Sequence, residues 1–361
     1  MYKYTHGGDV YDESGHFKIS MLDFSAGINP LGMPAGALAA AKQAAELSIV
    51  YPDSSCRLLV SKLASFESVG ENAILCGNGA SDLIFRLVYA IKPKKILVTA
   101  PSFADYERAG RAAGAEVIYH YLKESGGFRI TCELAAAIYT AAPDIVFLCN
   151  PNNPTGNLTD MDTLTAIAEA CKSVNAVLLV DECFLDFVQD SGTYTAKKLL
   201  SVHKTIVVLK AFTKIFAMPG LRLGYAICEN SVLLDRMRFY GPDWPVSTVA
   251  QAAGIAALEV GRKYIEKTAN YIRDERERMT TQLERLGMTV YPSSANFIFF
   301  RDPWCGTIRD KLQKYGVLIR DCQNFTGLDS GYYRVAVLTN EKNTRLLEAL
   351  KEVKAAWQNQ S

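Results

Sequence analysis

The sequence has no apolar run long enough to cross a bilayer, because its longest hydrophobic runs are only the length of a strand. Its first residues, MYKYTHGGDVYDESG, are polar and contain glycine, and they lack the apolar core of an export signal. These absences predict a protein that is neither exported nor membrane-spanning, and we expect it in the cytoplasm.

The sequence also lacks an excess of charge of either sign. Its 39 Lys and Arg residues nearly cancel its 38 Asp and Glu residues, which leaves a formal net charge of +1. Non-specific binding to nucleic acid needs a positive patch, so we expect no nucleic-acid partner. With 49% hydrophobic residues the chain can bury a sizeable core, and small molecules are the expected partners.

Clustered cysteines are missing as well. No CxxC pair and no Cys/His spacing of a zinc site occurs, so no metal site is expected. An odd, scattered set of thiols is typical of reduced cysteines in a cytosol. The nine cysteines are Cys56, Cys76, Cys132, Cys149, Cys171, Cys183, Cys228, Cys305 and Cys322.

Short apolar runs alternate with helical stretches from about residue 73 to residue 230. Continuous apolar strands separated by helices predict an α/β fold with a mostly parallel central sheet, covered by helices on both faces. Ligands bind such sheets at the carboxyl ends of the strands. The expected strands are residues 96–101, 116–122, 144–150, 176–182, 205–212 and 224–229.

The pattern changes after about residue 250. A long charged amphipathic stretch leads into short β-rich pieces and a last helix from Glu341 to Trp357, which predicts a separate, smaller α+β domain. A chain of 361 residues is long enough for two domains. We expect an N-terminal arm (1–30) that packs with the small domain, a large domain (31–250) and the small domain (251–361).

Lys214 is the first candidate for chemistry, in the segment AFTKIFAMPGLRLGY. A lysine at the end of a buried strand is partly desolvated, which favours the neutral amine that can attack an aldehyde. Arg222 follows eight residues later, and its fork of donors suits a phosphate. This spacing alone leaves open that both side chains are simply solvated.

Three further segments end or follow expected strands. CGNGASD would place free backbone N–H groups of a helix start at Ala80 and Ser81 around an anion, or Ser81 would only cap the helix. NPNNPTG forms a rigid turn that would present the Asn153 amide, or it is only a structural turn. Asp181 ends AVLLVDE, where a buried carboxylate needs a partner such as a protonated ring nitrogen, or a cap or salt bridge.

Together, in this order on one sheet, these segments resemble the aminotransferase-like enzymes of fold type I, which use pyridoxal 5'-phosphate (PLP). The resemblance covers essentially the whole chain. It implies that Lys214 holds the cofactor as a Schiff base and later shuttles a proton, that Asp181 pairs with the pyridine nitrogen and that Asn153 contacts the ring hydroxyl oxygen. It implies phosphate contacts from Ala80, Ser81, Thr213 and Arg222.

The resemblance extends to two aromatic residues and shows two departures. Phe103, in APSFADY, would stack on the ring face, unless it is a core aromatic. Tyr51, in VYPDSS, matches a tyrosine that reaches the neighbouring subunit's cofactor phosphate, which implies a homodimer with shared active sites. Ala211 and Phe184 stand where Ser or Thr and Tyr are common in this fold, and each removes one hydrogen bond to the cofactor.

Other strings are similar to one branch of the family, the threonine-phosphate decarboxylases of cobalamin synthesis. They include THGGD, LDFSAGINPLG, PSSANFIFF, LIRDCQNFTGL and YYRVAV. This likeness implies that Arg334 binds the substrate carboxylate and that His6 and Arg320 bind its phosphate, with Asn153 also near the substrate. Arg320 in a surface ion pair and His6 in a mobile arm are the alternatives. Asn29 would contact substrate or stabilise its own turn.

The expected reaction is therefore decarboxylation of O-phospho-L-threonine. Leu338 stands where such enzymes commonly have a second arginine, and losing that contact could cost about 1.5–3 kcal/mol of binding. A close analogue such as O-phosphoserine, or an unphosphorylated amino acid, stays open as substrate. Histidinol-phosphate aminotransferases share the cofactor motifs, so transamination is the alternative. A non-catalytic regulatory protein is a third hypothesis, disfavoured by the presence of Lys214 and the lack of length for a DNA-binding segment.

Overall fold

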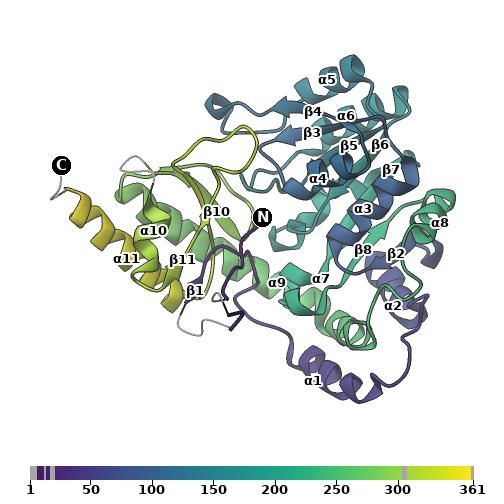
Figure 1. Cartoon of the computed structure of the whole chain (residues 1–361), viewed down its shortest axis with the longest axis horizontal. Helices are drawn as coiled ribbons and strands as arrows, with labels where there is room; N and C mark the ends of the chain where they lie inside the picture. The colour runs from purple at the N-terminus through teal and green to yellow at the C-terminus, as the bar shows by residue number, and fades with distance from the viewer. Residues whose placement is uncertain (1–5, 12–13, 17–20, 303–306, 359–361) are drawn as a thin grey trace.

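The computed structural model describes residues 6–11, 14–16, 21–302 and 307–358 (Figure 1). A seven-stranded sheet in the order β2-β8-β7-β6-β5-β3-β4 forms its centre. The pairings among β3, β4, β5, β6 and β7 are parallel, and only β8 runs antiparallel to both of its neighbours. The predicted mostly parallel sheet is therefore confirmed. Its strands are β2 (Ile74–Gly77), β3 (Lys95–Ala100), β4 (Glu116–Tyr121), β5 (Ile145–Cys149), β6 (Val177–Asp181), β7 (Ile206–Ala211) and β8 (Gly224–Ile227).

Alternate side chains of the strands enter two separate cores, one on each face of the sheet. Phe147 and Leu179 point to the face covered by α3, α4 and α8. Val146 and Leu178 point to the face covered by α2, α5, α6 and α9. Strands buried on both faces explain the continuous apolar runs of the sequence. The helices are α2 (Arg57–Glu67), α3 (Ala80–Ile91), α4 (Ala104–Ala112), α5 (Glu133–Ala141), α6 (Met161–Ser173), α7 (Phe212–Ile215), α8 (Ser231–Phe239) and α9 (Thr248–Arg285).

The C-terminal part forms a second, antiparallel sheet in the order β12-β13-β10-β9. The segment after residue 20 packs with this part, because β1 pairs with β11 in parallel and the Phe24 carbonyl accepts from the Ala336 N–H at 2.8 Å. Figure 1 shows the N-terminal segment beside these strands. The elements outside the central layer are β1 (Leu22–Asp23), α1 (Ala35–Ala44), β9 (Thr289–Val290), β10 (Phe297–Arg301), α10 (Ile308–Gln313), β11 (Val317–Leu318), β12 (Arg320–Asp321), β13 (Tyr332–Ala336) and α11 (Asn340–Gln358).

Helix α9 joins the two parts of the molecule. It begins after Ser247, whose hydroxyl caps the helix by accepting from the Ala250 N–H at 3.2 Å, and it continues to Arg285. The charged amphipathic pattern predicted only the part of the helix from Gly261 onward, because residues 248–260 are mostly apolar and more buried. The expected boundary at residue 250 falls inside this helix, and the domain limits stay a prediction.

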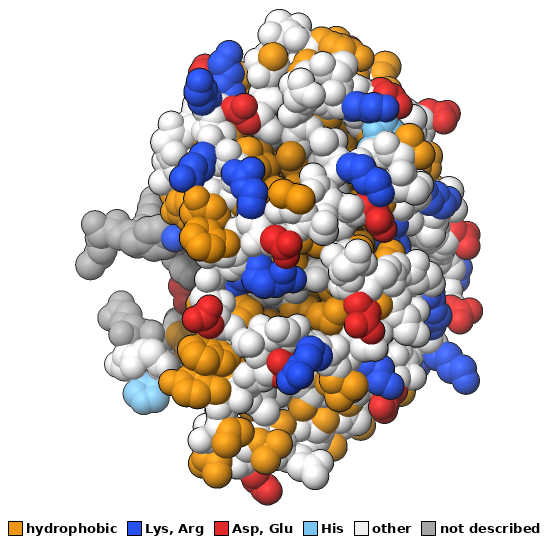
Figure 2. All heavy atoms as spheres, turned by 90° about the vertical axis from the view of Figure 1, so that its right-hand side faces the viewer, with side chains coloured by type: hydrophobic (Ala, Val, Ile, Leu, Met, Phe, Trp, Pro, Cys, Tyr) orange, Lys and Arg blue, Asp and Glu red, His pale blue; other side chains and the backbone are white. Residues whose placement is uncertain are grey.

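The surface carries charges of both signs. Figure 2 shows Lys and Arg side chains interspersed with Asp and Glu side chains over one face. Among the described residues, no helix is both long enough and apolar enough to span a membrane.

Candidate active site

A cavity of about 370 Å³ lies at the carboxyl ends of β5, β6 and β7, where they meet the C-terminal part. It brings together residues from His6, near the start of the chain, to Arg334 on its last strand, β13. The predicted site residues that line it are His6, Ala80, Ser81, Phe103, Asn153, Asp181, Thr213, Lys214, Arg222, Arg320 and Arg334.

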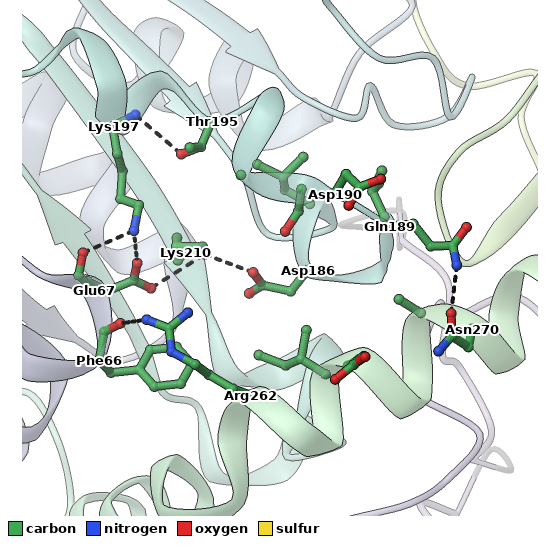
Figure 3. A pocket seen from close by; sticks show the side chains of 17 residues that line it. Phe66, Glu67, Asp186, Gln189, Asp190, Thr195, Lys197, Lys210, Arg262 and Asn270 are labelled. Atoms are coloured by element: carbon green, nitrogen blue, oxygen red, sulfur yellow. Dashed lines mark hydrogen bonds and ion pairs between the residues drawn. The ribbon is translucent and has the colours of Figure 1, made fainter.

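A larger cavity, of about 460 Å³, contains none of the predicted residues. Its two lysines are neutralised within the protein (Figure 3), since Lys210 lies 2.9 Å from Asp186 and 3.4 Å from Glu67, and Lys197 pairs with Glu67. These two lysines hold the pKa of Glu67 at about 2 although burial alone would raise it. The larger cavity therefore carries a closed charge network rather than a reactive centre.

Lys214 lies in the short helix α7, directly after β7. Burial, and then the positive charges of Arg334 and Arg222, lower the pKa of its amine to about 8. Its Nζ lies 5.8 Å from the centre of the Phe184 ring. A neutral amine is therefore far more populated near neutral pH than for an exposed lysine, which suits attack on an aldehyde.

Asp181 ends β6 deep in the cavity. Its carboxylate accepts from the Tyr106 hydroxyl at 2.6 Å and from the Cys183 N–H at 3.0 Å, and burial raises its pKa. Both donors are neutral, so a cationic partner would relieve the cost of the buried charge. The next residue, Glu182, is bound by Thr195 and Ala196 instead, and it does not line the cavity.

The turn where β2 leads into α3 has a backbone arrangement suited to an anion. Gly79 has a φ of 82°, and a side chain there would lie 2.6 Å from the Arg222 guanidinium. A side chain at Gly224 would lie 2.7 Å from the Ala80 nitrogen. These glycines let Arg222 approach the N–H groups that begin α3, which is the arrangement that binds phosphate. Ser81 donates to Asp105 at 2.6 Å.

Asp105 and Tyr106 are site residues that the sequence reasoning missed. Asp105 accepts from Ser81 and lies 3.3 Å from His6, and these two contacts hold its pKa low although burial opposes them. Tyr106 stacks on Phe147, with ring centres 5.0 Å apart, and presents its hydroxyl to Asp181. The helical spacing in FADY from Phe103 would place Tyr106 on the same helix face, and that was the available signal.

Arg334, on β13, also lines the cavity. Its guanidinium donates to Asn153 Oδ1 and, at 2.7 Å, to the Ser25 carbonyl, and it lies 4.9 Å from the centre of the Phe297 ring. Its Nε is buried without a hydrogen-bond partner. Burial lowers the pKa of Arg334 to about 10. A guanidinium held by neutral acceptors, with one donor unused, is suited to a carboxylate.

Arg320 and His6 also line the cavity. Arg320 donates to the Asp321 carbonyl and to Asn324 Oδ1, each at 2.8 Å, and lies over the Phe325 ring. The His6 ring lies 5.4 Å from Phe103. Three basic side chains, Arg334, Arg320 and His6, therefore line the same cavity, which favours a substrate with more than one negative charge.

Asn29 and Tyr51 do not line the cavity. The Asn29 amide donates to the Ile215 carbonyl at 2.7 Å and to Thr268 at 3.0 Å, so it ties α7 to α9, and a substrate contact stays only a prediction. Tyr51 is 76% exposed and stacks on Trp244. Its contact with a neighbouring subunit also stays a prediction. Leu338 is buried, pairs with Asn343 through its backbone and does not line the cavity.

The donors of this cavity fit PLP. A lysine of lowered pKa suits the aldehyde of PLP. A buried carboxylate with neutral partners and the aromatic Phe103 suit its pyridine ring, and a helix start beside Arg222 suits its phosphate.

Comparisons with known proteins agree with this geometry. The model of the family "Aminotransferase class I and II" matches residues 19–350. The chain is 37% identical to the threonine-phosphate decarboxylase of Salmonella typhimurium, over 98% of this chain and 97% of that protein. It is 33% identical to the histidinol-phosphate aminotransferase of Symbiobacterium thermophilum, over 95% and 92%. The crystal structure of the histidinol-phosphate aminotransferase from Clostridium acetobutylicum superposes with a TM-score of 0.86 and 31% identity, over 93% of this chain and 100% of that one. The chain therefore belongs to the class I and II aminotransferase family.

Proposed function

We propose that this protein is a PLP-dependent enzyme that decarboxylates O-phospho-L-threonine to an aminopropanol phosphate for cobalamin synthesis. The presence of Arg334, Arg320 and His6 in the cavity that also holds Lys214 and Asp181 carries the proposal, because it supplies separate partners for a carboxylate and a phosphate. The similarity to the Salmonella typhimurium threonine-phosphate decarboxylase over nearly the whole of both chains supports it.

The residues of the cavity have separate roles in the proposed reaction. PLP, when bound, supplies an electron sink for the charge left at the substrate Cα. Asp181 would pair with the ring nitrogen, and Ser81, Thr213 and Arg222 would hold the cofactor phosphate. Arg334, Arg320 and His6 would bind and orient the substrate, and this orientation would select which bond at Cα breaks. The Lys214 amine delivers or removes the proton at Cα, and its pKa of about 8 suits that task near neutral pH.

Transamination of histidinol phosphate is the second candidate. The resemblance in fold and sequence to two histidinol-phosphate aminotransferases favours it. The two reactions differ in the need for a keto acid, and that difference separates them experimentally.

The test incubates purified holoenzyme with O-phosphothreonine and no keto acid. We expect release of CO2, and none from Lys214→Ala. Arg334→Gln should raise KM, with a loss of about 1.5–3 kcal/mol in binding. If the wild-type enzyme releases no CO2 and converts histidinol phosphate only when 2-oxoglutarate is present, the decarboxylase assignment is wrong.

We further propose that the enzyme is a cytoplasmic homodimer whose active sites are shared through Tyr51. Support comes from an exposed apolar strip on one side of the chain, in which Ile49 is 91%, Val50 59% and Trp244 47% exposed. Large exposed apolar side chains in sequence neighbours are typical of an interface. Support for the compartment comes from the unpaired state of the described cysteines, most of them buried.

A further inference from the structure

The string LIRDCQNFTGL continues past Arg320 into a loop, residues 322–328, to which the proposed reaction assigns no role. Two residues of this loop, Asn324 and Phe325, line the active-site cavity together with Arg320. The Arg320 guanidinium lies 5.0 Å from the centre of the Phe325 ring. It donates to Asn324 Oδ1 and to the Asp321 carbonyl, each at 2.8 Å. The loop therefore holds the guanidinium both from one face and from its edge.

This support affects how well Arg320 can bind an anion. An arginine side chain has many rotamers, and ordering it costs free energy when an anion binds. Two fixed acceptors and an aromatic face order the side chain beforehand, so less of that cost remains. These two acceptors are neutral oxygens, which direct the guanidinium without cancelling its charge. Arg320 is therefore preorganised for a group of high negative charge, such as a phosphate.

The base of the loop is fixed to the C-terminal part. The Cys322 N–H donates to the Tyr332 carbonyl at 2.9 Å, and the Phe325 N–H donates to the Cys322 carbonyl at 3.0 Å. The Leu328 N–H donates in turn to the Phe325 carbonyl at 3.1 Å. The side chains of Phe325 and Leu328 are buried. The position of Asn324 is therefore set by a turn that backbone hydrogen bonds and two buried side chains hold in place.

The tip of the loop contacts the central layer. The Thr326 hydroxyl donates to Glu107, on α4, at 3.3 Å. Gly327 has a φ of 86°, and a side chain there would lie 3.2 Å from the Tyr121 ring on β4, the edge strand of the central sheet. The loop thus bridges the two parts of the molecule. This bridge keeps Arg320 at a set place in the cavity that lies between them.

We propose that Asn324 is a positioning residue that determines specificity: it holds Arg320 so that the enzyme selects amino acids that carry a phosphate. Without the Asn324 acceptor, the guanidinium loses one of its anchors and binds a phosphate at a higher ordering cost. The carboxylate partner Arg334 has its own acceptors, Asn153 and Ser25, and does not depend on Asn324. The inference rests on the proposed function in one respect, that the substrate carries a phosphate, and not on which bond breaks.

The test compares O-phospho-L-threonine with L-threonine, which differ only in the phosphate. Each amino acid is mixed with holoenzyme in a stopped-flow instrument, and the first change in cofactor absorbance gives its Kd whether or not CO2 is released later. Wild-type enzyme should bind the phosphorylated amino acid more tightly. Asn324→Ala should raise the Kd of O-phospho-L-threonine about tenfold and leave that of L-threonine unchanged.

The matched control is Gln323→Ala, because Gln323 is an exposed neighbour of Asn324 that does not line the cavity. It should change neither Kd. A double variant tests whether Asn324 acts through Arg320: in Arg320→Gln enzyme, Asn324→Ala should cause no further loss of affinity. A loss that persists in the Arg320→Gln enzyme, an equal loss for both amino acids, or no loss at all would contradict the inference.

The inference and the proposed function fail in different ways. An enzyme that gives the expected binding results but releases no CO2 refutes decarboxylation alone. An enzyme that releases CO2, while Asn324→Ala keeps the wild-type preference for the phosphorylated amino acid, refutes the role of Asn324 alone. Equal Kd values in the wild type also refute that role, because the enzyme would then select nothing through the phosphate.

Discussion

At the scale of single residues, the chemistry of the site depends on how burial and neighbouring charges tune Lys214. An exposed lysine has a pKa of about 10.4, whereas burial and the charges of Arg334 and Arg222 bring that of Lys214 to about 8. Raising the pH through 8 therefore converts the ammonium to the amine that attaches the cofactor. In cofactor-free enzyme, the rate of PLP attachment should rise about tenfold per pH unit below 8 and become constant above it.

The control for this prediction is a pair of variants measured by stopped-flow absorbance. Arg334→Gln removes a charge that lowers the pKa of Lys214, so the rise should move to higher pH. Arg320→Gln changes another cavity-lining arginine that does not set this pKa, and its profile should match that of the wild type. Identical profiles for all three proteins would contradict the electrostatic explanation.

Residue by residue, the sequence predicted the site best where the chemistry is local. Lys214, Asp181 and Asn153 follow strands directly, so their place at one sheet edge follows from the parallel topology. Asp105 and Ser25 were missed because their roles depend on partners that only the tertiary fold brings near: His6 and Arg334. Asn29 was selected because it lies in the LDFSAGINPLG motif, yet its amide donates to residues of α7 and α9 and links these two helices.

At the scale of elements, the turn from β2 into α3 makes a sharp prediction about Gly79. Alanine there adds a Cβ 2.6 Å from Arg222 on a backbone with a φ of 82°, so Gly79→Ala should weaken PLP binding by at least about tenfold. Gly114→Ala is the matched control, because its φ is 80° but no atom lies within 4 Å of the added Cβ. It should lose roughly 1 kcal/mol of stability and keep its PLP affinity. Fluorescence titration with PLP measures both, and equal affinities would refute the crowding argument.

The strands were predictable and the helix limits less so, for a physical reason. Buried parallel strands need continuous apolar runs, and the observed bounds of β3 to β8 fall within a residue or two of those runs. Helix α9 has no single pattern: its first part is buried nearly all round and its second part is amphipathic. A periodicity argument therefore detects only the second part.

Glu67, the last residue of α2, leads to a prediction about stability in acid. Glu67 pairs with Lys210 and Lys197, and its pKa of about 2 in the folded state is below the unfolded value of about 4.5 (Figure 3). A carboxyl group with a lowered folded pKa stabilises above its unfolded pKa, and this contribution is lost as the pH falls from about 4.5 to about 2. The shift corresponds to about 3 kcal/mol at neutral pH.

Urea unfolding across pH checks this. Glu67→Gln leaves the buried Lys210 and the partly buried Lys197 short of a counter-charge, so it should lose about 3 kcal/mol at neutral pH and show a flatter profile below pH 4.5. The control is Glu133→Gln, which removes an ion pair with Lys123 whose two side chains are 61% and 68% exposed and should leave the free energy of unfolding unchanged. Equal effects of the two substitutions would show that the network contributes no more than a surface pair.

At the scale of the whole molecule, the central sheet and the C-terminal part meet at the active-site cavity, and α9 connects them in one piece. Composition and the alternation of strands with helices predicted both parts of the molecule. No local sequence pattern, however, predicts how the two parts are oriented toward each other. Arg334 and Asn153 are 181 positions apart and bridge the two parts by a direct hydrogen bond. Contacts of this kind arise only from the assembled fold.

The last prediction concerns assembly. Tyr51 is 76% exposed, yet it stacks on Trp244 with ring centres 4.3 Å apart, so its ring is held in place at the surface. If a second subunit covers this strip and uses the Tyr51 hydroxyl at its cofactor phosphate, Tyr51→Phe should leave the dimer intact and weaken PLP binding by about 1.5 kcal/mol, roughly tenfold. Tyr139→Phe, at a position 56% exposed in α5, is the matched control and should change neither property. Sedimentation equilibrium and PLP titration measure the two properties separately, and a monomer with full PLP affinity would refute shared active sites because each subunit would then be complete on its own.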